Sequence, residues 1–263
     1  MAERRVPIRL VVPATLGAAF VVLPLIGLLL AAPWPSVASL LVEPGTLTAL
    51  WLTLMTSVVT VVLVAVLGTP LAYVLARSHR RGVSLLRAGL MIPLVLPPVV
   101  AGVALLAAFG RTSVIGGWLH ATLGVTVPFT TVAVIMAHTF VALPFYILAV
   151  EGSLTTVDEE YDVAAAVLGA DRWTTFTRVT LPMALPGVTA GAALAWARSI
   201  GEFGATITFA GNYPGVTQTF PLAIYGALQI STDTAIALSV VLLVVSVAVL
   251  FLLRGRWVGG LTR

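Results

Sequence analysis

Long apolar stretches alternate with short polar connections along almost the whole chain. A helix needs roughly 20 apolar residues to cross the hydrocarbon core of a bilayer. Six stretches meet this requirement, and they cover residues 10–32, 47–76, 84–110, 127–150, 183–209 and 233–253. The pattern therefore predicts an all-α integral membrane protein with six transmembrane helices. No separate soluble domain or clear repeat is visible, so we expect residues 1–263 to form one transmembrane domain with its core at about 45–253.

Two of these stretches allow a second interpretation. The first follows charged residues, as a cleaved signal peptide would, but it is longer than the usual apolar region of about 7–15 residues. The third contains Pro93, Pro97 and Pro98, which interrupt helical hydrogen bonding. Neighbouring helices can satisfy the freed backbone groups. We therefore expect both stretches to be membrane spans.

The arginines are distributed unevenly between the two sides of these spans. Twelve of the fourteen lie at the N-terminus, in the second-to-third and fourth-to-fifth connections, or in the C-terminal tail: Arg4, Arg5, Arg9, Arg77, Arg80, Arg81, Arg87, Arg172, Arg178, Arg254, Arg256 and Arg263. Arg111 lies in an opposite connection and Arg198 lies inside a span. Basic residues gather on the cytoplasmic side of membrane proteins. We therefore expect a multi-pass protein of the cytoplasmic membrane with both termini in the cytoplasm.

Composition agrees with this location and excludes several kinds of chemistry. The chain is 59% hydrophobic and 9% charged, whereas a soluble domain carries roughly 25% charged residues. It contains no cysteine and no lysine, so it has no thiolate metal site and no P-loop lysine for ATP. Its three histidines show no metal-ligand spacing. We expect a protein that is not an enzyme, has no metal or other cofactor, and binds lipid rather than nucleic acid.

A polar segment at about residues 155–182 separates the fourth and fifth spans. Thr156 and Glu159 fit a capping box, and the helix that follows would place Asp162, Ala165 and Gly169 on one face. Asp171 can cap a second short helix running to about residue 180, with a proline beyond it to set the turn into the fifth span. The pattern predicts two short helices, at an angle, on the cytoplasmic surface.

The same segment carries a spaced motif. Ala164 and Ala165 precede Gly169, and nine residues separate this glycine from the Val-Thr-Leu-Pro run that contains Val179, Leu181 and Pro182. The spacing resembles the coupling loop of ABC importer permeases, written E-A-A-x3-G-x9-I-x-L-P, which docks onto a separate ATPase. Val163 stands where the family usually has its Glu, and Asp162 is the nearest acid. The alternative interpretation is a capped amphipathic loop without a partner.

The resemblance extends over nearly the whole chain. It includes the Pro-Leu-Val-Leu-Pro-Pro run of the third span, Gly-Glu-Phe-Gly-Ala-Thr-Ile in the fifth, and the later Thr-Gln-Thr and Pro-Leu-Ala-Ile-Tyr segments. Together these are similar to the permease subunits of molybdate ABC transporters. Sulfate permeases share the Gly-Glu-Phe/Tyr-Gly core and the Ala-Gly-Asn that follows it.

This resemblance implies a six-helix type I ABC importer fold and a defined set of partners. They are a second copy of the chain, two ATPase subunits that bind ATP and Mg, and an extracytoplasmic molybdate-binding protein. The expected function is ATP-driven import of molybdate. A sulfate, thiosulfate or tungstate permease of the same family is the first alternative, and an ion-coupled secondary transporter or a membrane scaffold are alternatives of other classes.

Two charged residues fall inside the fifth predicted span. Arg198 and Glu202 are four residues apart, so one helix face presents both. They could border an anion passage, or they could form an ion pair that fixes helix packing. Gly201 and Gly204 would allow close helix approach, and Thr206 and Asn212 would offer neutral polar groups along the same region.

Overall fold

The computed structural model describes residues 7–78 and 80–258, and this part of the chain is helical without a β-strand. Arg4, Arg5 and Arg263, which contributed to the predicted orientation, lie outside it. The helices are α1 (Ile8–Leu30), α2 (Trp34–Leu41), α3 (Pro44–Arg77), α4 (Arg81–Val95), α5 (Pro98–Phe109), α6 (Val114–Leu123), α7 (Thr131–Leu154), α8 (Glu160–Val167), α9 (Arg172–Thr175), the π-helical turn η1 (Phe176–Thr180), α10 (Leu181–Met183), α11 (Leu185–Ile200), α12 (Gly204–Phe209), α13 (Phe220–Leu228) and α14 (Thr232–Val258).

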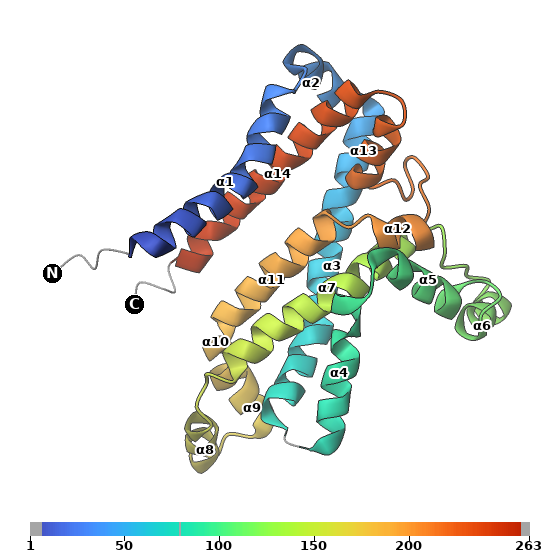
Figure 1. The fold of residues 1–263 in the computed structure, drawn as a ribbon. Helices are drawn as coiled ribbons and strands as arrows, with labels where there is room; N and C mark the ends of the chain where they lie inside the picture. Colours follow the sequence, from blue (N-terminus) through green and yellow to red (C-terminus); the bar gives the residue numbers. More distant parts are fainter. Residues whose placement is uncertain (1–6, 79, 259–263) are drawn as a thin grey trace.

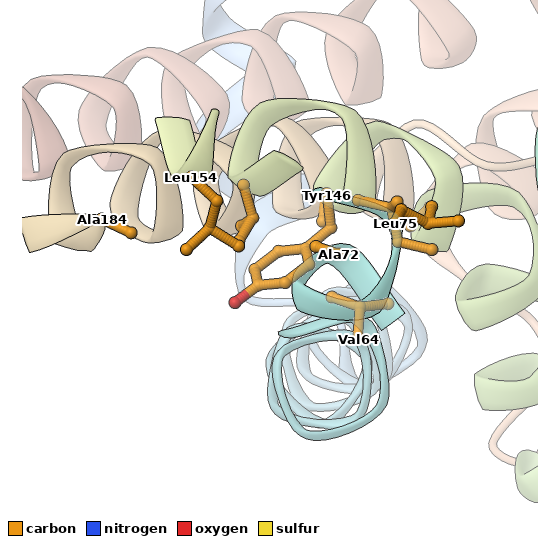
Figure 2. Packing of buried hydrophobic residues seen from close by; sticks show 10 residues of the cluster. Val64, Ala72, Leu75, Tyr146, Leu154 and Ala184 are labelled. Carbon is orange, nitrogen blue, oxygen red and sulfur yellow. The ribbon is translucent and has the colours of Figure 1, made fainter. Parts of the chain in front are cut away.

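Three helices form the centre of the bundle. α3, α7 and α11 pack against one another, while α1 and α14 run side by side along one flank (Figure 1). Their shared core contains Val64 and Leu75 of α3 and Tyr146 and Leu154 of α7, all at most 1% exposed (Figure 2). The hydroxyl of Tyr146 lies 2.7 Å from that of Thr69, so the one polar atom of this ring is hydrogen-bonded to the neighbouring helix.

The number of membrane spans agrees with the prediction only when bent helices are counted as single spans. Four helical segments of the described chain are long and apolar enough to cross a bilayer unbroken: α1, α3, α7 and Thr232–Val249 of α14. Two further spans would each consist of two helices joined at a sharp bend. The first pair is Gly82–Val95 with Pro98–Phe109, and the second is Arg172–Met183 with Leu185–Ile200. The length and apolar composition of these helices make the protein a multi-pass membrane protein.

The third predicted span, residues 84–110, is broken near its middle. α4 and α5 meet at an angle of 119°, and the break falls at Leu96 and Pro97. Leu96 has a ψ of 132°, as expected for a residue forced out of the helical region by the proline that follows it. Pro97 also has an extended ψ of 136° and precedes Pro98, so two successive residues leave the helix and the chain turns.

The fifth predicted span, residues 183–209, also divides. α11 ends at Ile200, and α12 starts separately at Gly204. The carboxylate of Glu202 accepts a hydrogen bond from the N–H of Ala205 at 2.8 Å, which satisfies a free donor at the start of the new helix. At its other end α11 meets the helix Arg172–Met183 at a bend of 70°. α12 then packs on α5, so the two broken spans meet each other.

Candidate functional site

The segment between α7 and α11 forms two short helical elements that project from one end of the bundle (Figure 1). The prediction of a capping box at Thr156 and Glu159 was wrong, because Thr156 does not cap α8. The hydroxyl of Thr156 donates back to the carbonyl of Ser153 at 2.7 Å, because this residue lies in the turn that directly follows α7. α8 begins at Glu160 instead, and its N–H is bound by the carboxylate of Asp158 at 3.0 Å.

Gly169 ends α8 with a left-handed backbone, at a φ of +85°. Its N–H donates to Ala166 and that of Ala170 donates to Ala165, both at 3.0 Å, which is the Schellman arrangement of a helix end. A Cβ at this position would meet no atom of residues 7–78 or 80–258 within 4 Å. The structure therefore gives a backbone reason for a glycine at this position, because L side chains rarely adopt such a φ.

Asp171 caps the second element, as its position predicts. Its carboxylate accepts a hydrogen bond from the N–H of Thr174 at 2.7 Å. Hydrogen bonding from the hydroxyl and the N–H of Thr174 lowers the pKa of this exposed carboxyl below its ordinary value. This helix was expected to end near residue 180. It instead continues through Pro182 to Met183 and bends at Ala184.

The surface of these helices carries several apolar side chains without cover. Val163, Val167, Leu168 and Trp173 are between 63% and 87% exposed. Among the motif residues, Ala164 and Pro182 are exposed and Val179 and Leu181 are half-buried, whereas Ala165 is buried. We call Val163, Val167, Leu168 and Trp173 the exposed apolar face. Apolar side chains gathered at the surface in this way are typical of a site that contacts a partner.

Asp162 makes its contacts within the protein. Its carboxylate lies 3.3 Å from the guanidinium of Arg77, at the end of α3, and accepts a hydrogen bond from the hydroxyl of Thr180 at 2.8 Å. In the sequence, Arg77 contributes to the uneven charge distribution and Thr180 lies within the motif. No local signal in the sequence relates either residue to Asp162, because the three come from separate helices.

A cavity of about 1200 Å³ opens beside this contact. Its lining is mainly apolar and comes from α3, α7, α11 and the two short helical elements, with Thr69, Tyr73, Tyr146, Phe176 and Val188 among the residues that form it. Arg77 and Asp162 lie on its wall as well. The cavity therefore joins the centre of the bundle to the projecting helices.

The two charged residues of the fifth predicted span form an ion pair. Arg198 lies in the last turn of α11, and its guanidinium binds the carboxylate of Glu202. The side chain of Glu202 is 1% exposed and that of Arg198 is 25% exposed. The ion-pair interpretation therefore has a direct structural basis. Its partly exposed arginine is still compatible with a role beside a passage.

The remaining candidates of this region differ in their surroundings. A Cβ at Gly204 would lie 2.7 Å from Cβ of Pro98, so α12 touches α5 only because this residue is a glycine. A Cβ at Gly201 would meet its nearest neighbour at 3.8 Å, so within the described residues no other helix comes as close to this glycine as α5 does to Gly204. The hydroxyl of Thr206 and the side-chain oxygen of Asn212 are buried and have no hydrogen-bond partner among the described residues.

A second buried polar contact joins α7 to α11. Nδ1 of His138 lies 2.9 Å from the hydroxyl of Ser199, and both side chains are buried. The sequence indicates a polar residue in each helix but not that they meet. Among the described residues, no group of three or more His, Cys, Asp or Glu side chains could hold a metal ion.

Residues 68–259 match the family described as "Binding-protein-dependent transport system inner membrane component". The molybdenum transport system permease protein ModB of Mycobacterium tuberculosis (strain ATCC 25618 / H37Rv) is 48% identical over 237 residues, which cover 90% of this chain and 89% of that protein. ModB of Escherichia coli (strain K12) is 39% identical over 74% of this chain and 86% of its own length. The sulfate transport system permease protein CysT of the same strain is 35% identical over 83% of this chain and 79% of its own length.

Solved structures of ABC transporters share the architecture. A chain of a bacterial alginate ABC transporter, in complex with its alginate pentasaccharide-bound periplasmic protein, aligns with a TM-score of 0.75 at 18% identity, covering 93% of this chain and 91% of that one. A chain of the MetNI methionine ABC transporter aligns with a TM-score of 0.61 at 21% identity, covering 82% of this chain and 95% of that one. At these identities the likeness concerns the fold, and it confirms the predicted type I importer fold.

Proposed function

Because this chain belongs to the family of binding-protein-dependent transport system inner membrane components, we propose that it is the transmembrane subunit of an ATP-driven importer of molybdate. The substrate is inferred from the relatives named molybdenum transport permeases, which reach 48% identity over 90% of the chain. The sulfate permease reaches 35% over 83%. Sulfate, thiosulfate and tungstate remain the alternatives within the family.

The exposed apolar face supports the proposal that a separate ATPase subunit docks here and supplies the energy for transport. Val167 and Leu168 are 82% and 87% exposed on helices that project from the bundle. Burial of such side chains in a groove of an ATPase would remove apolar surface from water and stabilise docking. Asp162, Ala164, Ala165, Gly169, Val179, Leu181 and Pro182 would then form the coupling loop, with its tight turn at Gly169.

The proposed assembly contains two copies of this chain, two ATPase subunits and an extracytoplasmic molybdate-binding protein. The projecting helices would lie in the cytoplasm, together with both termini, in accordance with the arginine distribution. ATP and Mg would be bound by the ATPase subunits alone. Closure of the ATPases on ATP would draw the two coupling loops together and open the pathway outward, and hydrolysis would return it inward.

A secondary transporter that works alone is the alternative of another class. Such a protein would use ion gradients and commonly shows inverted repeats, of which the sequence gives no clear sign. It would also have no use for an exposed apolar face on the projecting helices. Removal of the ATPase partner distinguishes the two, because only an ABC importer would lose uptake.

The first experiment measures cellular uptake of molybdenum, tungsten and labelled sulfate at nanomolar supply, with and without this chain and with its partners intact. Loss of molybdenum uptake, not reproduced by excess sulfate, is the expected result. Loss of sulfate uptake alone would replace the substrate and leave the fold and coupling loop unchanged. Unchanged uptake of all three anions would refute the proposed function.

A further inference from the structure

Arg77 connects the last turn of α3 to the helices that project from the bundle. One terminal nitrogen of its guanidinium donates to the carbonyl of Val157 at 3.2 Å and lies 3.5 Å from the carboxylate of Glu159. The other lies 3.3 Å from the carboxylate of Asp162 in α8. The side chain of Arg77 is only 14% exposed, so solvent screens these contacts less than it screens a surface ion pair.

Asp162 extends this contact to the second projecting element. While one carboxylate oxygen faces Arg77, the other accepts the hydroxyl of Thr180 at 2.8 Å. Thr180 is fully buried. A single carboxylate therefore ties the end of α3, α8 and η1 together. The guanidinium and the carboxylate attract each other as an ion pair, and the hydrogen bond from the hydroxyl of Thr180 to this carboxylate is stronger than one between two neutral groups.

A second contact lies one helical turn before Arg77. The rings of Tyr73 in α3 and Phe176 in η1 pack edge to face, with centroids 4.9 Å apart. Tyr73 and Arg77 are four residues apart and share one face of α3. α3 therefore holds the projecting segment at two points, so a displacement of that segment must either break both contacts or move α3.

The position that usually carries the motif Glu cannot make such a contact here. Val163 is apolar and 63% exposed, whereas the acid one residue earlier faces inward. From these contacts we infer that Arg77 is a positioning residue that passes the displacement of the coupling loop to α3 through Asp162. This inference rests on the proposed function, because it concerns how the same loop drives the pathway.

α3 is suited to receive this displacement. It packs against α7 and α11, and it contributes Ala65, Thr69 and Tyr73 to the wall of the cavity of about 1200 Å³. Tyr73 and Thr69 lie about one and two turns from Arg77 on the same helix, so a shift at the Arg77 end moves part of the cavity wall. Packed interiors respond to such shifts as units rather than by local deformation.

The chain supplies a matched control for loss of an ion pair. Arg87 in α4 binds the carboxylate of Glu151 in α7 and donates to the carbonyl of Leu75 in α3 at 3.0 Å. It thus touches α3 near the same end of the bundle, but its ion pair involves no residue of the projecting segment. Arg87→Gln removes an arginine–carboxylate pair at the same end of the bundle, although a more exposed one, and leaves the contacts of Asp162 in place.

The experiment uses the complete complex in proteoliposomes, with its binding protein, and measures molybdate transported per ATP hydrolysed. We expect this ratio to fall about tenfold in Arg77→Gln and Asp162→Asn, the size of a typical coupling between contacting residues. Arg77→Lys, which keeps the charge, should retain most of the ratio, and Arg87→Gln should change it less than twofold. The double variant Arg77→Gln/Asp162→Asn should fall no further than Arg77→Gln.

Docking is measured separately by cross-linking. The native chain has no cysteine, so Val167→Cys provides a single attachment point for a photo-cross-linker on the exposed apolar face. Its yield with the ATPase subunit should be the same with and without Arg77→Gln. Asp162→Asn, a nearly isosteric change, decides the test if Arg77→Gln does not assemble.

The outcomes separate this inference from the function on which it rests. Absence of ATP-driven uptake and of cross-linking in the wild type would overturn both. A wild-type ratio in Arg77→Gln and Asp162→Asn, beside normal wild-type transport, would overturn only the inference. An equal fall in Arg87→Gln, or a cross-linking yield that falls in parallel with the ratio, would also overturn it, since either would indicate a general or a docking defect.

Discussion

At the scale of single residues, two buried or half-buried carboxylates illustrate how charge is accommodated in this membrane protein. Asp162 and Glu202 each face an arginine and each accept a hydrogen bond from the chain that follows. Burial of an unpaired carboxylate is costly, so each arginine makes its acid tolerable. The two pairs differ in how far apart their members lie in the sequence. Arg198–Glu202 is local, whereas Arg77–Asp162 joins helices that are distant in the sequence.

Substitution of Gly169 tests the coupling loop. Gly169→Val places a β-branched side chain at a φ of +85°, which costs about 1–2 kcal/mol for an L residue. We expect the Schellman end of α8 to rearrange, so that molybdate uptake per ATP falls while membrane insertion is unchanged. Gly152→Val is the control, because Gly152 is helical and has no atom within 4 Å of an added Cβ. Wild-type coupling in Gly169→Val would contradict the assignment of the loop.

The Arg198–Glu202 pair gives a second test at this scale. Arg198→Gln leaves the carboxylate of Glu202, which is 1% exposed, without its partner. Removal of one member of a buried pair costs about 3–5 kcal/mol. Glu202→Gln should cost less, because the remaining arginine is 25% exposed and can be hydrated. Thermal unfolding of the purified protein measures this order. Normal stability with lost uptake in Arg198→Gln would instead favour the role beside an anion passage.

At the scale of elements, helix breaks define the region where α5 and α12 meet. The proline pair at Pro97 and Pro98 turns the chain between α4 and α5, and Glu202 starts α12 after α11 has ended. Both breaks free backbone groups that a lipid-facing helix could not leave exposed. Their position against each other, with α12 packed on α5 and α7, keeps this irregular backbone within the protein.

Gly204 tests how tightly these elements are packed. In Gly204→Ala the new Cβ would lie 2.7 Å from Pro98, too close without a backbone shift. Overpacking of this kind costs about 1–3 kcal/mol. We expect a lower unfolding temperature for Gly204→Ala, and an almost unchanged one for Gly201→Ala, whose nearest contact would be at 3.8 Å. Equal stability of the two variants would show that α12 and α5 can separate without cost.

At the scale of the whole molecule, the large cavity and the projecting helices lie at the same end of the central bundle. The cavity is lined by α3, α7 and α11 together with the coupling loop. The part proposed to receive the ATPase and the centre of the bundle therefore share this cavity. Such an arrangement allows a docking event to change the cavity directly, without a long chain of intermediate contacts.

The division of labour in the proposed assembly can be measured with purified components. The chain contains no lysine and so lacks the residue that a P-loop uses on the phosphates. Alone in detergent or in liposomes, it is expected to hydrolyse no ATP. Together with its ATPase subunit it should support hydrolysis, and substitution of that subunit's P-loop lysine should abolish both hydrolysis and uptake. Hydrolysis by the isolated chain at the rate of the complex would refute this division.

The sequence by itself determined the membrane class, the helical content and the family. Apolar length is a local property, as is the cap at Asp171, and local patterns identify both. The end of α8 was not predicted, because the pattern placed Gly169 on a face of the helix, whereas in the structure α8 ends at Val167 and Gly169 is left-handed. Sequence also located the proline pair at residues 97 and 98 but did not show that the chain would turn there, since neighbouring helices can hold a proline-containing span straight.

Only the tertiary structure decided which polar groups meet. Arg77 with Asp162 and Thr180, and His138 with Ser199, come together because α3, α7 and α11 pack at particular angles and heights. Those angles depend on the fit of many side chains at once and not on any one segment. The inward direction of Asp162 and the outward direction of Val163 follow from the same packing. For that reason the link between the coupling loop and α3 became visible only in the folded molecule.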